Sequence, residues 1–190
     1  MRYLNWFLLI LIMGCVSQKP KVSKQSLDEL KKIVVEENIE FTARNASPLR
    51  FSGGINTYNT LPPGSNQNFV NLANIANYMR IFKDSISMDL PFFGGQRIIN
   101  AYSTDDNSFI FNQRIEEKSI SFDRKKQSYT LNLWVKGRQE SLRINFRLFS
   151  NHTASIVINS THRNAITYRG EWKVLKTKTK GVNLVKYKNQ

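Results

Sequence analysis

The sequence predicts a mainly β protein, folded as a single antiparallel curved sheet or as a barrel, with one short N-terminal helix. Apolar and polar residues alternate along several short segments, such as residues 129–136 and 142–148. This period of two is typical of strands that bury one face and expose the other to water. Apolar residues make up 41% and aromatic residues 12% of the 190-residue chain, so the sheet can bury a substantial core.

The N-terminus carries a short apolar run that ends at the only cysteine. Arg2 precedes the run Leu4–Met13, and Gly14 and Cys15 follow it. An apolar core of about 7–15 residues is typical of a secretory signal, whereas a membrane-spanning helix needs about 20 residues. The pattern resembles a bacterial lipobox, so we expect residues 1–14 to be a signal peptide and Cys15 to be lipidated. A plain secretory peptide with an incidental cysteine is the alternative.

The residues after the cysteine are polar and basic. Residues 15–26 contain a proline and no acidic residue, which is typical of a flexible tether. An acidic cluster here would resemble the signal that sends some lipoproteins to the outer cell surface. Its absence favours an anchor in the outer membrane that faces the periplasm, and the inner membrane stays open. Acylation would also use the only thiol, so we expect no disulfide and no thiolate metal ligand.

One helix is expected at the start of the domain, which we place over residues 27–175. Ser26 and Glu29 have the spacing of a capping box, with Ser26 as the N-cap. Leu27, Leu30, Ile33 and Val34 then fall on one helical face, and Asn38 is expected to end the helix.

Short alternating segments follow, and turn-forming residues separate them. The predicted strands lie around residues 39–43, 79–81, 85–90, 120–122, 129–136, 142–148, 156–158 and 166–172. The predicted turns are Lys83-Asp84, Lys125-Lys126, Gly137-Arg138, Asn151-His152 and Arg163-Asn164. Residues 53–67 are rich in glycine, proline and asparagine and predict a long loop.

The order of several short motifs resembles a known family. The motifs are Phe41, Ala43, Ala46 and Pro48; Tyr78; Leu90-Pro91-Phe92-Phe93-Gly94; and Ile166, Tyr168 and Gly170. In this order they resemble the bacterial lipoprotein family catalogued as domain of unknown function 4251, from about Leu27 to Trp172. The resemblance implies a lipocalin-like curved sheet or barrel, and it transfers no catalytic residue because the family has no established activity. The lysine-rich end beyond Val174 departs from the family pattern.

No motif in the sequence predicts catalysis, a metal site or a cofactor. His152 and His162 are expected in turns and lack the ligand spacing of an ordinary metal site. No serine stands in a nucleophile elbow. The acidic pairs Asp105-Asp106 and Glu116-Glu117 are adjacent in sequence, and neighbours on a strand point to opposite faces. We therefore expect a protein that is not an enzyme.

The chain is strongly basic, with a formal net charge of +14. Basic residues gather at Arg124-Lys125-Lys126 and in the tail over residues 176–190, which includes Lys176, Lys178 and Lys180. An exported protein rarely meets nucleic acid, so lipid headgroups and other anionic envelope components are the expected partners. A solvated tail without a partner is the alternative.

The sequence favours two kinds of function, and an enzyme whose site is assembled from residues far apart in sequence stays open as a third. The first is binding of a small apolar ligand inside the barrel, against Phe109, Phe111, Leu133 and Phe146, and it requires a cavity of a few hundred Å³. The second is a structural or assembly lipoprotein that contacts anionic envelope components through its basic surface.

Overall fold

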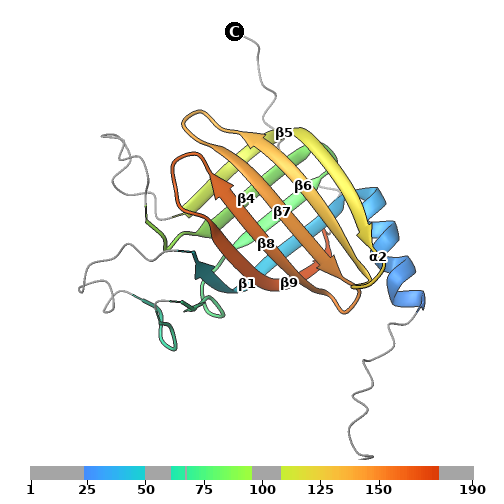
Figure 1. Ribbon diagram of the computed structural model, residues 1–190, viewed down its shortest axis with the longest axis horizontal. Coiled ribbons are helices and arrows are strands. Elements are labelled where there is room, and N and C mark those ends of the chain that lie inside the picture. Colours follow the sequence, from blue (N-terminus) through green and yellow to red (C-terminus); the bar gives the residue numbers. More distant parts are fainter. Residues whose placement is uncertain (1–23, 50–60, 67, 96–107, 176–190) are drawn as a thin grey trace, which may run out of the picture.

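The protein is a closed antiparallel β-barrel, as the alternation predicts. The computed structural model describes residues 24–49, 61–66, 68–95 and 108–175. These contain α2 (Lys24–Glu36), β1 (Asn38–Pro48), β2 (Val70–Asn71), β3 (Tyr78–Phe82), β4 (Ser85–Pro91), β5 (Ser108–Asp123), β6 (Ser128–Lys136), β7 (Ser141–Phe149), β8 (Thr153–Ser160) and β9 (Ile166–Val174). Figure 1 shows the strands wrapped around a common axis, with α2 at one end.

Consecutive strands from β3 to β9 pair with one another, and β1 pairs with both β3 and β9. The barrel therefore has eight strands, and the two-residue β2 adds only a short pairing to the end of β1. The five predicted turns are confirmed, since each lies between two consecutive antiparallel strands. The long loop expected over residues 53–67 lies mostly outside the described residues.

Alternate side chains of every barrel strand point inward and form one core. The period of two brings apolar residues of neighbouring strands into register, as in Leu131↔Phe146 and Phe146↔Ile156. Phe41, Met79, Met88, Phe146 and Tyr168 are among the fully buried side chains. Burial of this core is the main source of stability that the described residues show.

The seam between β1 and β9 closes the barrel at a point of very close backbone contact. Ala43 pairs with Gly170, and a β-bulge between Ala43 and Asn45 shifts the register immediately afterwards. A Cβ atom on Gly170 would lie 2.0 Å from the carbonyl oxygen of Thr42. Glycine is required here because no side-chain atom fits between the two strands.

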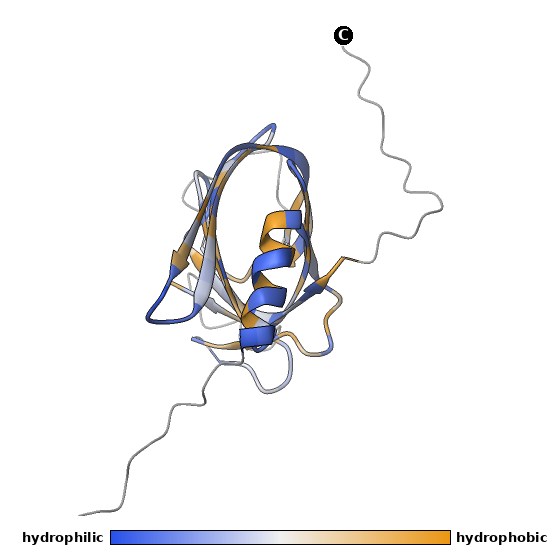
Figure 2. Cartoon of the chain, turned by 90° about the vertical axis from the view of Figure 1, so that its right-hand side faces the viewer, coloured by the Kyte–Doolittle hydropathy of each residue, from blue (hydrophilic) through white to orange (hydrophobic). Residues whose placement is uncertain are grey.

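Helix α2 covers one end of the barrel (Figure 2). Leu30, Ile33 and Val34 are buried against the core, so the predicted apolar face is confirmed. The helix ends at Glu36, and Glu37 follows in the left-handed conformation with a φ of 52°. The predicted start is wrong: the helix already includes Lys24, so Ser26 lies within its first turn and residues 24–26 are not tether.

Lys118 ties the helix end to the barrel. Its ammonium group forms ion pairs with Glu37, just after α2, and with Asp84 in the β3–β4 turn at 3.2 Å. Burial alone would lower the pKa of Lys118, but hydrogen bonds to the two carboxylates outweigh burial and raise the pKa. The Lys118 side chain is thus charged and holds three separate segments together.

A second polar cluster joins three strands on the outer wall. The Glu40 carboxylate of β1 lies 2.7 Å from Arg80 Nε of β3 and 2.7 Å from Lys173 Nζ of β9. Burial alone would raise the pKa of Glu40, but hydrogen bonds to Lys173 and Arg80 outweigh it and lower the pKa below its ordinary 4.5. The carboxylate therefore stays charged to lower pH in the folded protein than in the unfolded chain.

We expect Gly170→Ala to destabilise the protein by about 1–3 kcal/mol or more, because the added methyl group overlaps β1 and must force the seam apart. Urea denaturation would measure the loss. Arg169→Ala, at the neighbouring exposed position of β9, is the control and should change stability by less than about 0.5 kcal/mol. Equal stabilities of the two variants would contradict this account of the seam.

The stability contributed by the Glu40 cluster should depend on pH. It is complete above about pH 4.5 and is lost as the pH falls through the lowered pKa of the folded state. Glu40→Gln should therefore cost about 1 kcal/mol near neutral pH and almost nothing near pH 3. Glu171→Gln is the control, because among the described residues its exposed carboxylate forms an ion pair with Arg44 alone, and it should show a smaller difference. A Glu40→Gln deficit that does not change with pH, measured by urea denaturation, would argue against the cluster.

Candidate functional site

The four residues expected to line an interior site all belong to the buried core of the barrel. Phe109, Phe111, Leu133 and Phe146 are exposed by only 0%, 8%, 3% and 0%. Phe146 packs edge-to-face on Phe41 with ring centroids 5.7 Å apart, and Phe109 packs on Phe92 at 5.2 Å. These contacts are typical of side chains that fill a core.

A hollow with a volume of about 590 Å³ lies on the outer wall of the barrel, across β5, β6, β7 and β8. The residues that line it are Glu117, Lys118, Ser119, Asn132, Leu133, Trp134, Arg143, Ile144, Asn145 and Asn159. We call this surface the outer trough. Lys118, Leu133 and Ile144 point to the inside of the barrel by their register, so the remaining side chains form its accessible lining.

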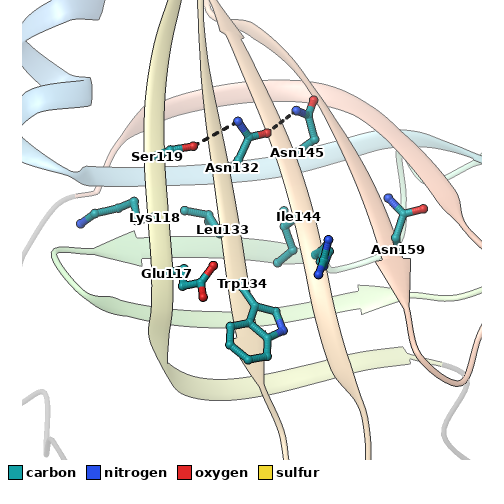
Figure 3. A pocket seen from close by; sticks show the side chains of 10 residues that line it. Glu117, Lys118, Ser119, Asn132, Leu133, Trp134, Ile144, Asn145 and Asn159 are labelled. Carbon is teal, nitrogen blue, oxygen red and sulfur yellow. Dashed lines mark hydrogen bonds between the residues drawn. The ribbon is translucent and has the colours of Figure 1, made fainter.

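The floor of the outer trough is a row of small polar side chains. Ser119, Asn132 and Asn145 stand directly opposite one another on β5, β6 and β7. Asn145 donates a hydrogen bond to Asn132 Oδ1 at 2.6 Å, and Asn132 donates one to Ser119 Oγ at 3.3 Å (Figure 3). These bonds fix the orientation of the amides and leave Asn145 Oδ1 directed away from the chain of bonds.

One side of the trough is a row of larger side chains. Glu117, Trp134 and Arg143 are paired across β5, β6 and β7, and Asn159 continues the row on β8. Figure 3 shows the Trp134 indole standing out from the wall next to the Glu117 carboxylate. The hollow forms because this row of large residues stands beside the row of small ones.

A β-bulge decides which acidic residue faces the trough. Between Ile115 and Glu117 the register with β6 shifts, so Glu117 and not Glu116 lies opposite Trp134. Within the described residues no ion pair joins Glu117 or Arg143 to another side chain. The trough therefore offers a carboxylate acceptor and a guanidinium donor to a ligand.

The histidines do not form a joint site. His152 lies in the β7–β8 turn with a φ of 62° and stacks on Trp172 at 4.6 Å. His162 lies beyond the other end of β8, where its Nδ1 is 2.8 Å from Thr161 Oγ1. Among the residues that the structure describes, no group of three or more histidine, cysteine or acidic side chains could hold a metal ion.

Several residues singled out from the sequence lie outside the described residues. They are the lipidation site Cys15, the acidic pair Asp105-Asp106 and the tail lysines Lys176, Lys178 and Lys180. Over the described ranges, no helix is long and apolar enough to cross a membrane.

Comparison with known proteins agrees with this architecture. The family model for the domain of unknown function DUF4251 matches residues 21–172. The chain belongs to this family. The crystal structure of a DUF4251 family protein from Bacteroides eggerthii is similar to it, with a TM-score of 0.53, 13% identity, and coverage of 79% of this chain and 88% of the other. At that identity the likeness shows the shared fold alone. No functionally curated protein matches the chain.

We expect Phe146→Ala to destabilise this DUF4251 barrel by about 3–5 kcal/mol, because the lost ring leaves a cavity in a packed core. Asn145→Ala, which changes the neighbouring outward residue and removes one hydrogen bond to Asn132, should cost only about 0.5–1.5 kcal/mol. Urea denaturation of both variants measures the difference. A loss below about 1 kcal/mol for Phe146→Ala would instead indicate that the ring borders space which a ligand can fill.

Proposed function

We propose that this DUF4251 protein is a binding protein of the bacterial envelope, and that it holds a small hydroxyl-rich ligand, such as a mono- or disaccharide, in the outer trough. The observation that carries the proposal is the partly exposed Trp134 indole beside a row of fixed amides. A volume of about 590 Å³ lies within the range of known small-molecule sites.

The chemistry of the lining matches a sugar ring. An indole offers a broad apolar surface with a polar edge, against which the C–H face of a pyranose can stack. The amides of Asn132, Asn145 and Asn159 both donate and accept hydrogen bonds, as hydroxyl groups do. Glu117 adds an acceptor and Arg143 adds donors, so the lining can both donate hydrogen bonds to ligand hydroxyl groups and accept them.

A small apolar ligand inside the barrel, the mode expected from the sequence, is less well supported. It would have to displace Phe109 or Phe146, which are fully buried and make edge-to-face contacts. The outer trough needs no such rearrangement. Native mass spectrometry of residues 16–190 tests for both ligands, because either would appear as an added mass that is lost on denaturation.

The proposal places the barrel on a membrane through acylated Cys15, in the outer membrane and facing the periplasm. The lipobox-like run before Cys15 and the lack of acidic residues after it support this location. Several acyl chains would make the anchor stable, since each buried methylene contributes about 0.8 kcal/mol. Metabolic labelling of the full chain with a palmitate analogue, with Cys15→Ala as the control, tests the anchor.

We expect Trp134→Ala to weaken saccharide binding by about tenfold or more, because stacking on the indole is lost. The measurement is saturation-transfer NMR with a panel of neutral, N-acetylated and uronic acid mono- and disaccharides. Tyr78→Ala is the matched control: it removes an aromatic side chain from the outer face of β3, away from the trough, and should leave binding unchanged. If no saccharide binds the wild-type protein, or if Trp134→Ala binds equally well, the proposed function is wrong.

A further inference from the structure

The second half of β5 extends beyond its partner on one side. β4 pairs with β5 only as far as Ser85↔Arg114, whereas β6 pairs with it to Asp123↔Ser128. Among the described residues no strand follows β5 on the β4 side from Glu116 onward. The second half of β5 therefore extends past β4, at the end of the barrel where α2 lies (Figure 1), while β6 stays paired with β7 as far as Ser128↔Phe149.

Two apolar side chains on this extension face the core side and are nevertheless exposed. Ile120 pairs with buried Leu131, and Phe122 pairs with Tyr129, so their side chains point to the inner face of the sheet. Ile120 is 42% exposed and Phe122 38% exposed. Phe122 and Tyr129 also pack together with ring centroids 4.7 Å apart. The hairpin thus presents an aliphatic residue and an aromatic pair to the surroundings.

Three consecutive cations occupy the turn of the same hairpin. Arg124, Lys125 and Lys126 are all exposed. Asp123 Oδ1 accepts hydrogen bonds from the backbone N–H groups of Lys125 and Lys126, at 2.9 and 3.0 Å, and these bonds lower the pKa of the Asp123 carboxyl. The only acidic side chain in the turn is therefore engaged with the backbone, and the turn is held in one shape.

The geometry points to an anionic phospholipid surface as the partner of this hairpin tip, which we define as residues 120–129. Aromatic side chains are favoured at the interface between lipid and water, and each Lys or Arg near an anionic surface contributes about 1 kcal/mol. Ile120, Phe122 and Tyr129 would insert at headgroup depth, while Arg124, Lys125 and Lys126 contact lipid phosphates. No other described loop joins exposed aromatic residues to three adjacent cations.

The position of the tip suits a protein anchored just before α2. If Cys15 is acylated, as proposed above, a fully extended chain brings Lys24 no farther than about 30 Å from the membrane. Lys118 joins the β5 extension to Glu37 after α2, so tip and helix share one end of the barrel. This end would face the lipid, while the outer trough on the side wall stays open to solvent. The contact itself does not depend on the acyl chains.

The experiment uses a protein of residues 16–190, which contains every described residue. It lacks Cys15, so an introduced cysteine is its only thiol. An environment-sensitive dye on Ser121→Cys, within the tip, is compared with the same dye on Arg138→Cys, in the turn at the opposite end of the barrel. The vesicles are phosphatidylcholine with or without phosphatidylglycerol. We expect a blue shift only for the dye at position 121 and only with phosphatidylglycerol.

Charge and apolar variants separate the tip from the rest of the basic surface. Lys125→Glu/Lys126→Glu should weaken vesicle binding by about tenfold or more, whereas Lys136→Glu/Arg138→Glu, an equal charge change at the far end, should weaken it by about threefold or less. Ile120→Ser/Phe122→Ser should also weaken binding; both side chains are exposed, and a thermal unfolding curve checks that the variant is folded.

Vesicle binding with an unshifted dye at position 121 would assign the contact to other basic residues, such as the tail lysines, and would overturn the proposal. Equal shifts at positions 121 and 138, wild-type binding by the serine variant, or pairing of the tips into a dimer without lipid would overturn it too.

Discussion

The rest of the structure depends on the pairing of β1 with β9. This seam turns a meander of hairpins into a closed wall, because Ala43 and Gly170 approach so closely that only glycine fits on β9. Closure removes the exposed edges that an open sheet would present for aggregation. It also gives the wall an inside and an outside, so each strand sends one set of side chains into the core and the other into solvent.

The outer trough is a consequence of that division. Side chains on the outer face lie in rows across the strands, and neighbouring rows need not match in size. Where Ser119, Asn132 and Asn145 form one row and Glu117, Trp134 and Arg143 the next, the wall becomes hollow. The core below is solid at this point, since Leu133 and Ile144 fill it. The proposed ligand site therefore needs no cavity inside the barrel.

Towards the end of the barrel where α2 lies, strand pairing is incomplete, and ion pairs between side chains connect the segments there. Lys118 connects the β5 extension with the residue after α2 and with the β3–β4 turn. Glu40 connects β1 with β3 and β9. These contacts hold the part of β5 that continues past β4, where Ile120 and Phe122 are exposed. The proposed saccharide site and the proposed lipid contact thus occupy different parts of one barrel, the side wall and one end.

The sequence by itself determined the class of fold, the apolar face of α2, the turns and the membership of Phe109, Phe111, Leu133 and Phe146 in the interior, because alternation with period two and helical spacing are local patterns. The start of α2 was missed, since Ser26 and Glu29 match a capping box although the helix already includes Lys24. Only the tertiary structure decided the site residues. Glu117, Asn132 and Arg143 lie on three strands, and a bulge that no local pattern indicates selects Glu117 over Glu116. Side chains that meet through cross-strand register are far apart in sequence, so their shared surface exists only once the strands are paired.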